Sequence, residues 1–192
     1  MRNANVQTLK PPIGFNIKVK ISDVLKEKAD ACIVPQYDKK ISMSGASRSL
    51  FYSSAKDGII ALQKHQETQR IPFGSAFLSP CSGKNYSYLI HLSVLGLNKD
   101  ISSFNALYFA TRVALKSAEK EKLNTIVITL ATKQENPLLT DEEMSLSIIK
   151  AIFDVKKELK HIREITILTQ NNNVCEIFCK TLGFINSLPP SL

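Results

Sequence analysis

The sequence lacks an uninterrupted apolar run of about 18 residues, the length at which a segment becomes a candidate transmembrane helix. Residues 1–10 are polar, without the charged stretch and apolar block that are typical of a secretory signal. We therefore expect neither a membrane span nor a signal peptide. With 192 residues, 44% of them hydrophobic, the chain can bury one core, and one domain is the expected count.

Cysteine is sparse, without the density of a small secreted disulfide scaffold, which favours a reducing, cytoplasmic compartment. The four cysteines are Cys32, Cys81, Cys175 and Cys179. The last two stand four residues apart and can share a helix face, yet none of the three histidines lies at metal-ligand spacing from them. We expect no metal site and no cofactor.

The chain also lacks the motifs that most directly indicate a reaction: a lipase-type serine elbow, a Walker loop or a dinucleotide glycine fingerprint. Cys81 stands next to a turn, but it would act as a nucleophile only beside a base that the sequence cannot reveal. His91 follows an apolar run, which fits a core histidine better than a catalytic base. A binding module is therefore favoured over an enzyme, and the question of activity stays open.

Charge is the first positive feature. The formal net charge is +8 and the pI about 9.3, which favours anionic partners, nucleic acid included. Many lysines fall on helical patterns among glutamates, as Lys116 and Lys120 do beside Glu119 and Glu121. A solvated surface is the preferred interpretation, with a nucleic-acid patch as the alternative.

Strand patterns recur along the chain, first as strict alternation and then as β-branched, apolar runs that are typical of strands buried on both faces. The expected strands are residues 15–21, 29–35, 74–79, 86–93, 125–131 and 164–169. Pro35 is expected to end the second strand, because proline cannot donate to the ladder. Turn-forming residues between the third and fourth strands predict a hairpin.

Helical patterns lie between these strands, with apolar residues at steps of three and four. The expected helices are residues 47–66, 103–123, 140–159 and 171–183. Thr140 and Glu143 form a capping box, Asn171 or Asn172 suits the start of the last helix, and Gly183 suits its end.

Strands interleaved with helices predict a three-layer α/β/α fold with a mixed, mostly parallel central sheet, because each connecting helix must bury its apolar stripe on that sheet. The domain is expected over residues 15–185, after a flexible segment at residues 1–14 and before a tail at residues 186–192. In such a sheet, ligands bind beyond the carboxyl ends of the strands.

Six segments between about residues 18 and 182 follow the order and spacing of a known family at low identity. They are Ile21-Ser-Asp-Val24, Ala29-Asp-Ala-Cys-Ile-Val-Pro35, Gly74-Ser-Ala-Phe-Leu78, Tyr88-Leu-Ile-His91, Thr125-Ile-Val-Ile-Thr129 and Cys175-Glu-Ile-Phe-Cys-Lys-Thr-Leu182. In these segments the chain resembles the macrodomain family of ADP-ribose-binding, Appr-1''-p processing-like proteins, as a divergent member. The resemblance implies the macrodomain fold and ADP-ribose or an ADP-ribosylated protein as the partner.

The resemblance also implies which residues would bind the ligand. Asp23 matches the aspartate that accepts a hydrogen bond from the adenine amino group, although capping the chain after a strand explains an aspartate there equally well. Asp38 falls where the distal ribose is bound, and Gly45 is the one glycine kept in the first phosphate loop. Tyr37 and Thr132 complete the expected lining.

Both phosphate loops depart from the family pattern. In the first, Met43, Ser44 and Ala46 stand where glycines would let backbone amides approach a diphosphate. The second, residues 130–139, has no glycine, and Glu135 would repel a diphosphate if its side chain pointed inward. Three basic residues, Lys39, Lys40 and Arg48, could replace the lost contacts to the diphosphate with a positive charge. The preferred interpretation is that they are ordinary exposed side chains.

Three functions stay open. The first is a macrodomain-like module that binds ADP-ribose, a related nucleotide or an ADP-ribosylated partner. The second is a degenerate scaffold without nucleotide binding, acting through protein or nucleic-acid contacts, in which side chains of residues 41–48 or 133–139 fill the crevice. The third is an ADP-ribosyl hydrolase with Asp38 as its candidate catalytic residue, although a fold alone does not establish a reaction.

Overall fold

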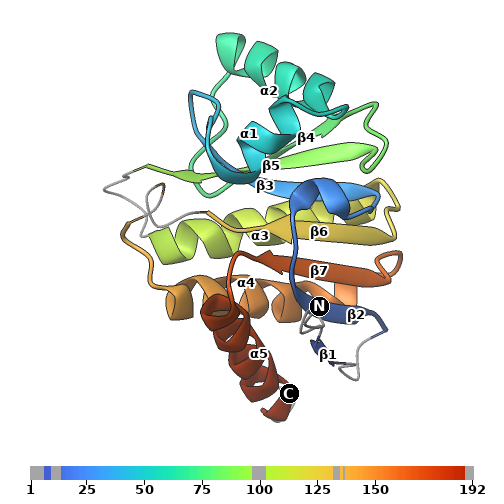
Figure 1. Cartoon of the computed structure of the whole chain (residues 1–192), viewed down its shortest axis with the longest axis vertical. Helices are drawn as coiled ribbons and strands as arrows, with labels where there is room; N and C mark the ends of the chain where they lie inside the picture. The colour runs from blue at the N-terminus through green and yellow to red at the C-terminus, as the bar shows by residue number, and fades with distance from the viewer. Residues whose placement is uncertain (1–6, 10–13, 97–102, 132–134, 136, 189–192) are drawn as a thin grey trace.

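The computed structural model describes residues 7–9, 14–96, 103–131, 135 and 137–188. Its strands are β1 (Gln7–Leu9), β2 (Asn16–Ile21), β3 (Ala31–Tyr37), β4 (Ala76–Pro80), β5 (Tyr88–Leu95), β6 (Thr125–Thr129) and β7 (Glu164–Thr169). In the described residues they form one sheet in the order β1-β2-β7-β6-β3-β5-β4 (Figure 1). The five central strands are parallel, while β1 and β4 pair antiparallel at the two edges. The sheet is mixed and mostly parallel, as predicted.

Helices cover both faces of this sheet. They are α1 (Gly45–Phe51), α2 (Lys56–Thr68), α3 (Ser103–Lys120), α4 (Asp141–Val155) and α5 (Asn172–Ser187), with the short 3-10 helices η1 (Val24–Lys26) and η2 (Lys156–Glu158). Helices α3, α4 and α5 pack on one face, and η1, α1 and α2 on the other (Figure 1). This arrangement confirms the predicted three-layer fold.

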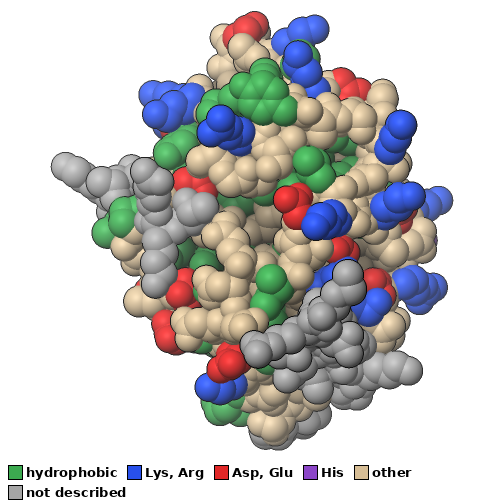
Figure 2. Space-filling model, viewed as in Figure 1, with side chains coloured by type: hydrophobic (Ala, Val, Ile, Leu, Met, Phe, Trp, Pro, Cys, Tyr) green, Lys and Arg blue, Asp and Glu red, His purple; other side chains and the backbone are tan. Residues whose placement is uncertain are grey.

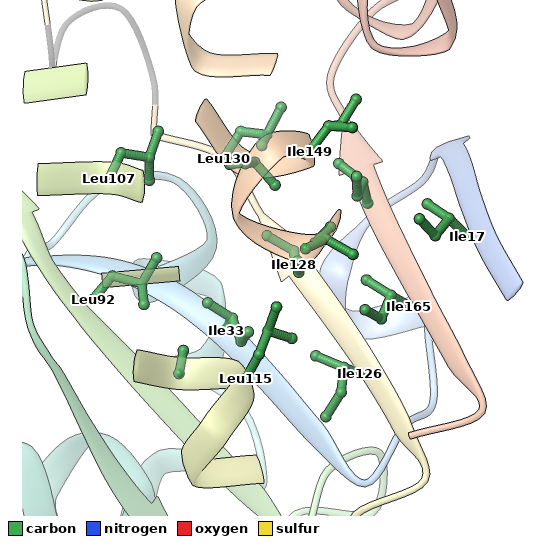
Figure 3. Packing of buried hydrophobic residues seen from close by; sticks show 14 of the residues in the cluster. Ile17, Ile33, Leu92, Leu107, Leu115, Ile126, Ile128, Leu130, Ile149 and Ile165 are labelled. Carbon is green, nitrogen blue, oxygen red and sulfur yellow. The ribbon is translucent and has the colours of Figure 1, made fainter. Parts of the chain in front are cut away.

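Two apolar cores hold the layers together, because alternate residues of a strand point to opposite faces. Ile33 of β3 and Ile128 of β6 point to the face covered by Leu115 of α3 (Figure 3). Val34, the next residue of β3, points to the other face and joins the core that contains Leu50 of α1. Each fully buried aliphatic side chain contributes roughly 1.5–3 kcal/mol. The strands are therefore rigid supports for the loops at their carboxyl ends.

Pro35 does not end β3, contrary to the sequence prediction. The strand continues to Tyr37 and pairs with β5 throughout, whereas its pairing with β6 stops at Ile33. Beyond Ile33 no described strand bonds to that edge of β3. Proline, which has no backbone N–H, is tolerated there because no neighbouring strand needs a hydrogen bond from that position.

The single helix predicted over residues 47–66 is divided into α1 and α2. Ser53 lies in the interruption, where its Oγ donates to the Leu50 carbonyl at 2.7 Å and accepts from the Ala55 amide at 3.1 Å. A serine side chain placed in this way gives the backbone an alternative to helical hydrogen bonds. The apolar period alone did not reveal this competition.

The ends of the domain also differ from the prediction. Helix α5 passes through Gly183, which lacks the positive φ of a helix-ending glycine, and continues to Ser187. Gln7–Leu9, expected within a flexible segment, pair with β2 as an edge strand. The boundaries at residues 15 and 185 stay predictions. No helix in the described part of the chain has the length and apolar character that crossing a membrane requires.

Candidate functional site

A crevice lies beyond the carboxyl ends of three neighbouring strands, β2, β7 and β6, beside the start of α1. It opens on the face shown in Figure 2. Its lining residues are Ser22, Asp23, Val24, Gly45, Ala46, Ser49, Thr129, Leu130, Leu168, Thr169 and Gln170. The volume is about 240 Å³. Since ligand pockets typically measure roughly 300–1,000 Å³, the crevice suits a small ligand or one end of a larger one.

Asp23 is held at the rim of the crevice by the local chain. It directly follows the turn after β2 and caps η1, its Oδ1 accepting from the Leu25 amide at 2.7 Å. Two side chains fix the turn: the Tyr86 hydroxyl donates to the Val24 carbonyl at 2.5 Å, and Nδ2 of the Asn85 side chain donates to the Leu25 carbonyl at 2.6 Å. No described residue donates to the second carboxylate oxygen, Oδ2.

The crevice combines an apolar wall with hydroxyl groups. Val24, Leu130 and Leu168 supply the apolar side chains. The hydroxyls of Thr129 and Thr169 already donate to backbone carbonyls, at 3.0 and 3.4 Å, so toward a ligand their oxygens are chiefly acceptors. The lining contains one carboxylate and neither lysine nor arginine.

Gln36 organises the loop between β3 and α1. Its side chain is fully buried, with Oε1 accepting from the Ser42 amide at 2.7 Å and Nε2 donating to the Ser47 hydroxyl at 2.7 Å. Gly45 follows with φ +50°, a conformation that favours glycine. A buried amide with both ends bonded fixes the loop in one shape. Gln36 was not predicted as a functional residue, because its only signal in the sequence is a polar residue inside a buried strand.

Glu135 joins this loop to the loop that follows β6. Its Oε1 accepts hydrogen bonds from the hydroxyls of Ser42, at 2.5 Å, and of Ser44. We call these three side chains the Glu135 bridge. Ser44 directly precedes Gly45, which lines the crevice, whereas none of the three side chains of the bridge is part of the lining. The sequence indicated Glu135 as a residue that would repel a diphosphate if it pointed inward, but it did not indicate the two serine partners.

No protein-family model and no curated protein sequence matches the chain. Its structure is similar to solved macrodomains. The Oceanobacillus iheyensis macrodomain with ADP superposes with a TM-score of 0.83 at 12% identity, covering 96% of this chain and 98% of that chain. For a Trypanosoma brucei macrodomain the TM-score is 0.74 at 12% identity, and the match covers 93% of this chain and 72% of that chain. For the macrodomain of Mycobacterium tuberculosis DarG the TM-score is 0.66 at 10% identity, and the match covers 81% of this chain and 99% of that chain.

The chain has the macrodomain fold. The fold implied by the resemblance in the sequence is thereby confirmed. At identities this low, the similarity shows the fold and does not show the function. In this macrodomain fold the crevice occupies the carboxyl ends of the parallel strands, the position where ligands bind in open α/β sheets.

The macrodomain fold brings only part of the predicted site together. Asp23 and Gly45 both line the crevice. Tyr37 and Asp38 do not: the Tyr37 ring lies under the ammonium of Lys40 at 4.8 Å, and Asp38 forms an ion pair with Arg70. Thr132 lies outside the described residues. Asp23 caps η1, as one of its two expected roles requires, and its position beside the crevice is compatible with the other, the binding of an adenine amino group.

The other candidates for chemistry are structural. His91 is fully buried, its Nε2 lies 2.9 Å from the Ser79 hydroxyl, and burial lowers its pKa to about 3. Burial likewise raises the pKa of the Cys81 thiol, which donates to the Tyr86 carbonyl. An uncharged imidazole and a protonated thiol away from the crevice provide no base and no nucleophile there. The described residues contain no cluster that could hold a metal ion.

The basic side chains form no single patch on the face that contains the crevice. Figure 2 shows lysines and arginines scattered over this face, most near its edges and some nearer its middle, with acidic side chains among them. Several are paired, for example Lys18 with Glu164 and Lys20 with Glu27. This distribution fits the solvated surface expected from the sequence.

Proposed function

We propose that this macrodomain-fold protein is a binding module for adenine-containing compounds, ADP-ribose or a related nucleotide among them, and that the adenine is bound beside Asp23. The observation that carries the proposal is the free Oδ2 of Asp23 at the rim of a crevice. A carboxylate oxygen accepts from the exocyclic amine of adenine, whereas guanine presents a carbonyl oxygen at the matching position.

The walls of the crevice support the same ligand. Val24, Leu130 and Leu168 provide apolar surface against which a flat base can pack. Thr129 and Thr169 place hydroxyl oxygens at the strand ends, where the hydroxyls of a ribose can donate to them. An apolar wall with a few polar groups at fixed positions is the usual composition of a small-molecule site.

Similar structures add support at the level of the fold. The Oceanobacillus iheyensis macrodomain was solved with ADP, and a variant of it with ADPR. Their likeness to this chain makes an adenine nucleotide the first ligand to test, while the evidence for the site comes from this chain's own residues.

The scaffold without nucleotide binding is the second candidate, and the Glu135 bridge favours it. Through its hydrogen bonds to Ser42 and Ser44, Glu135 joins residues 41–48 to residues 133–139, the two segments expected to fill the crevice in a scaffold. The hydrolase is less well supported, because Asp38 is held by Arg70 and does not line the crevice. An ADP-ribosylated protein and a nucleic acid stay predictions from the sequence as alternative partners.

The experiment is a calorimetric titration of the protein with adenosine, ADP-ribose and guanosine, repeated on Asp23→Asn. Asparagine also caps helices, so the turn is preserved while one acceptor oxygen becomes a donor. We expect adenosine to bind the parent and guanosine not, and Asp23→Asn to lose about tenfold or more in affinity, because an unpaired donor costs roughly 1–3 kcal/mol.

Glu121→Gln is the matched control, since it removes one exposed carboxylate before β6, at the strand end opposite the crevice. Its affinities should equal those of the parent. Absence of binding by every adenine compound at millimolar concentration, in a folded protein, would overturn the proposal and leave the scaffold.

A further inference from the structure

A second hollow adjoins the crevice at the carboxyl ends of β6 and β7, where α4 and α5 begin (Figure 1). Its volume is about 470 Å³, and we call it the α4–α5 hollow. The lining residues are Leu130, Ala131, Asp141, Met144, Gln170, Asn171, Asn173 and Val174. Leu130 and Gln170 also line the crevice, so the two spaces meet at these residues.

The strand ends connect the crevice to the hollow. In the proposed function, Thr129 and Thr169 accept hydrogen bonds from ribose hydroxyls at the ends of β6 and β7. The residues that directly follow these threonines are Leu130 and Gln170, the two that line both spaces. A ribose beside the threonines therefore lies next to the α4–α5 hollow, and a substituent on that ribose is directed into it.

Three primary amides supply most of the polar groups of the hollow. The side chains of Gln170 and Asn173 have no hydrogen-bond partner in the described part of the chain. Asn171 caps α5, its Oδ1 accepting from the Val174 amide at 3.0 Å, while its Nδ2 is a donor without a partner there. A primary amide carries both donors and an acceptor, so its complement is a ligand group that also has both.

Apolar side chains form the rest of the lining. Leu130, Met144 and Val174 are at most 8% exposed, and Ala131 is partly buried. Asp141 is nearly buried at the start of α4, and the lining includes no lysine, arginine or histidine. An apolar wall with a few hydrogen-bonding groups suits a neutral polar group that carries a short alkyl chain.

We propose that the α4–α5 hollow is a second subsite, which binds a carboxamide substituent on the ribose of an adenine nucleoside. The carbonyl of the substituent accepts from Nδ2 of Asn171, and its N–H donates to the side-chain oxygen of Asn173 or Gln170. This inference rests on the proposed function, because the base beside Asp23 determines where the substituent points. It names the ligand class more narrowly, as an adenosine that carries an amide-linked group.

The test is a calorimetric titration of the parent with adenosine, adenosine-5′-N-ethylcarboxamide, the matching ethyl ester and AMP. The ester has the same size and alkyl group as the carboxamide but no N–H donor. We expect the carboxamide to bind about tenfold or more tighter than adenosine, because it adds hydrogen bonds and buries its ethyl group. It should also bind about fivefold tighter than the ester and tighter than AMP.

Two variants locate the preference in the hollow. Asn173 lines the hollow and not the crevice, so Asn173→Leu should lower the ratio of carboxamide to ester affinity about threefold or more and change the affinity for adenosine less than about twofold. Gln63→Leu is the matched control, since it removes an exposed primary amide from α2, away from both spaces. It should leave all ratios as in the parent.

The results that contradict the inference differ from those that contradict the proposed function. If adenosine binds but the carboxamide binds no tighter than adenosine or the ester, the hollow is not an amide subsite, and the adenine site still stands. If AMP gains over adenosine as much as the carboxamide does, the hollow selects an anion and the inference is wrong. If no adenine compound binds, the proposed function fails and the inference fails with it.

Discussion

Asp38 Oδ2 lies 2.6 Å from a guanidinium nitrogen of Arg70, and neither residue of this ion pair lines the crevice. Asp38 immediately follows β3, where the resemblance placed a ribose-binding residue. In this chain its backbone also takes part in the fold, since its carbonyl accepts from the Ile71 amide at 3.4 Å. The pair joins the end of β3 to the segment after α2.

Asp38→Asn should therefore leave ligand binding unchanged. Arg70 is 66% exposed, and exposed ion pairs contribute roughly 0.2–1 kcal/mol, so the free energy of unfolding should fall by no more than about that amount. Urea denaturation and an adenosine titration check both expectations. A large loss of affinity with stability intact would place Asp38 in the site and restore the hydrolase as a candidate.

Two helical glycines should respond oppositely to alanine. A Cβ at Gly183 in α5 would meet nothing within 4 Å, so Gly183→Ala should raise the free energy of unfolding by roughly 0.4–1 kcal/mol. A Cβ at Gly58 in α2 would lie 2.9 Å from Leu89 Cδ1 and 3.0 Å from Cys81 Cβ. Gly58→Ala should therefore lower the free energy of unfolding. The overpacking costs about 1–3 kcal/mol, and the higher helix propensity of alanine offsets part of that cost.

Thermal and urea unfolding of the two variants measure this difference directly. Each serves as the control for the other, because the chemical change is the same and only the space around the glycine differs. Stabilisation by Gly58→Ala would mean that Leu89 and Cys81 move apart at little cost.

His91 should make the protein sensitive to mild acid. Its pKa falls from 6.5 to about 3 in the folded protein because burial disfavours the charged form. The unfolded chain therefore binds more protons below pH 6.5, and the stability is present above that pH and lost as the pH falls toward 3. From pH 6.5 to 5 this histidine alone should lower the free energy of unfolding by about 2 kcal/mol.

His91→Gln keeps a polar partner for the Ser79 hydroxyl and removes the titrating group. Urea denaturation at several pH values should show a much flatter dependence between pH 6.5 and 5, whatever the absolute stability of the variant. An equal slope in both proteins would contradict the assignment to His91.

The cysteines should react slowly in the folded protein. Burial raises the pKa of Cys32, Cys81 and Cys179, the last from 9.0 to about 11, with Cys175 adding to the effect at Cys179. Since the thiolate is the reactive form, alkylation of Cys179 by iodoacetamide at pH 7.5 should be roughly a hundredfold slower than that of an unperturbed cysteine. In urea all four thiols should react rapidly; one fast thiol in the folded protein would indicate a nucleophile.

The sequence correctly predicted features that depend on residues close together in the chain, such as helix caps. The capping box of Thr140 and Glu143 is present, with the Thr140 amide donating to Glu143 at 2.9 Å and the Glu143 amide donating to Thr140 at 3.1 Å. Asn171 caps α5 as expected, accepting from the Val174 amide. Such bonds join residues three apart, so their geometry follows from the order of residues.

Features that depend on distant parts of the chain were missed or misplaced. Pro35 is tolerated inside β3 only because β6 ends early beside it. Glu135 and Ser42 are 93 residues apart, and no periodicity relates them. The same holds for the buried Gln36, whose two partners belong to a loop with no regular pattern. The sequence thus indicated where the crevice lies, but not which side chains join the loops next to it.

The most direct measurement of the central claim is the perturbation of amide resonances when the ¹⁵N-labelled protein is titrated with adenosine. We expect the shifts to concentrate on residues 22–24, on the start of α1 and on residues 168–170. At an adenosine concentration near the Kd of the parent, Asp23→Asn should reduce these shifts severalfold. Shifts confined to other surfaces, or a spectrum unchanged up to millimolar adenosine, would contradict an adenine site in this crevice.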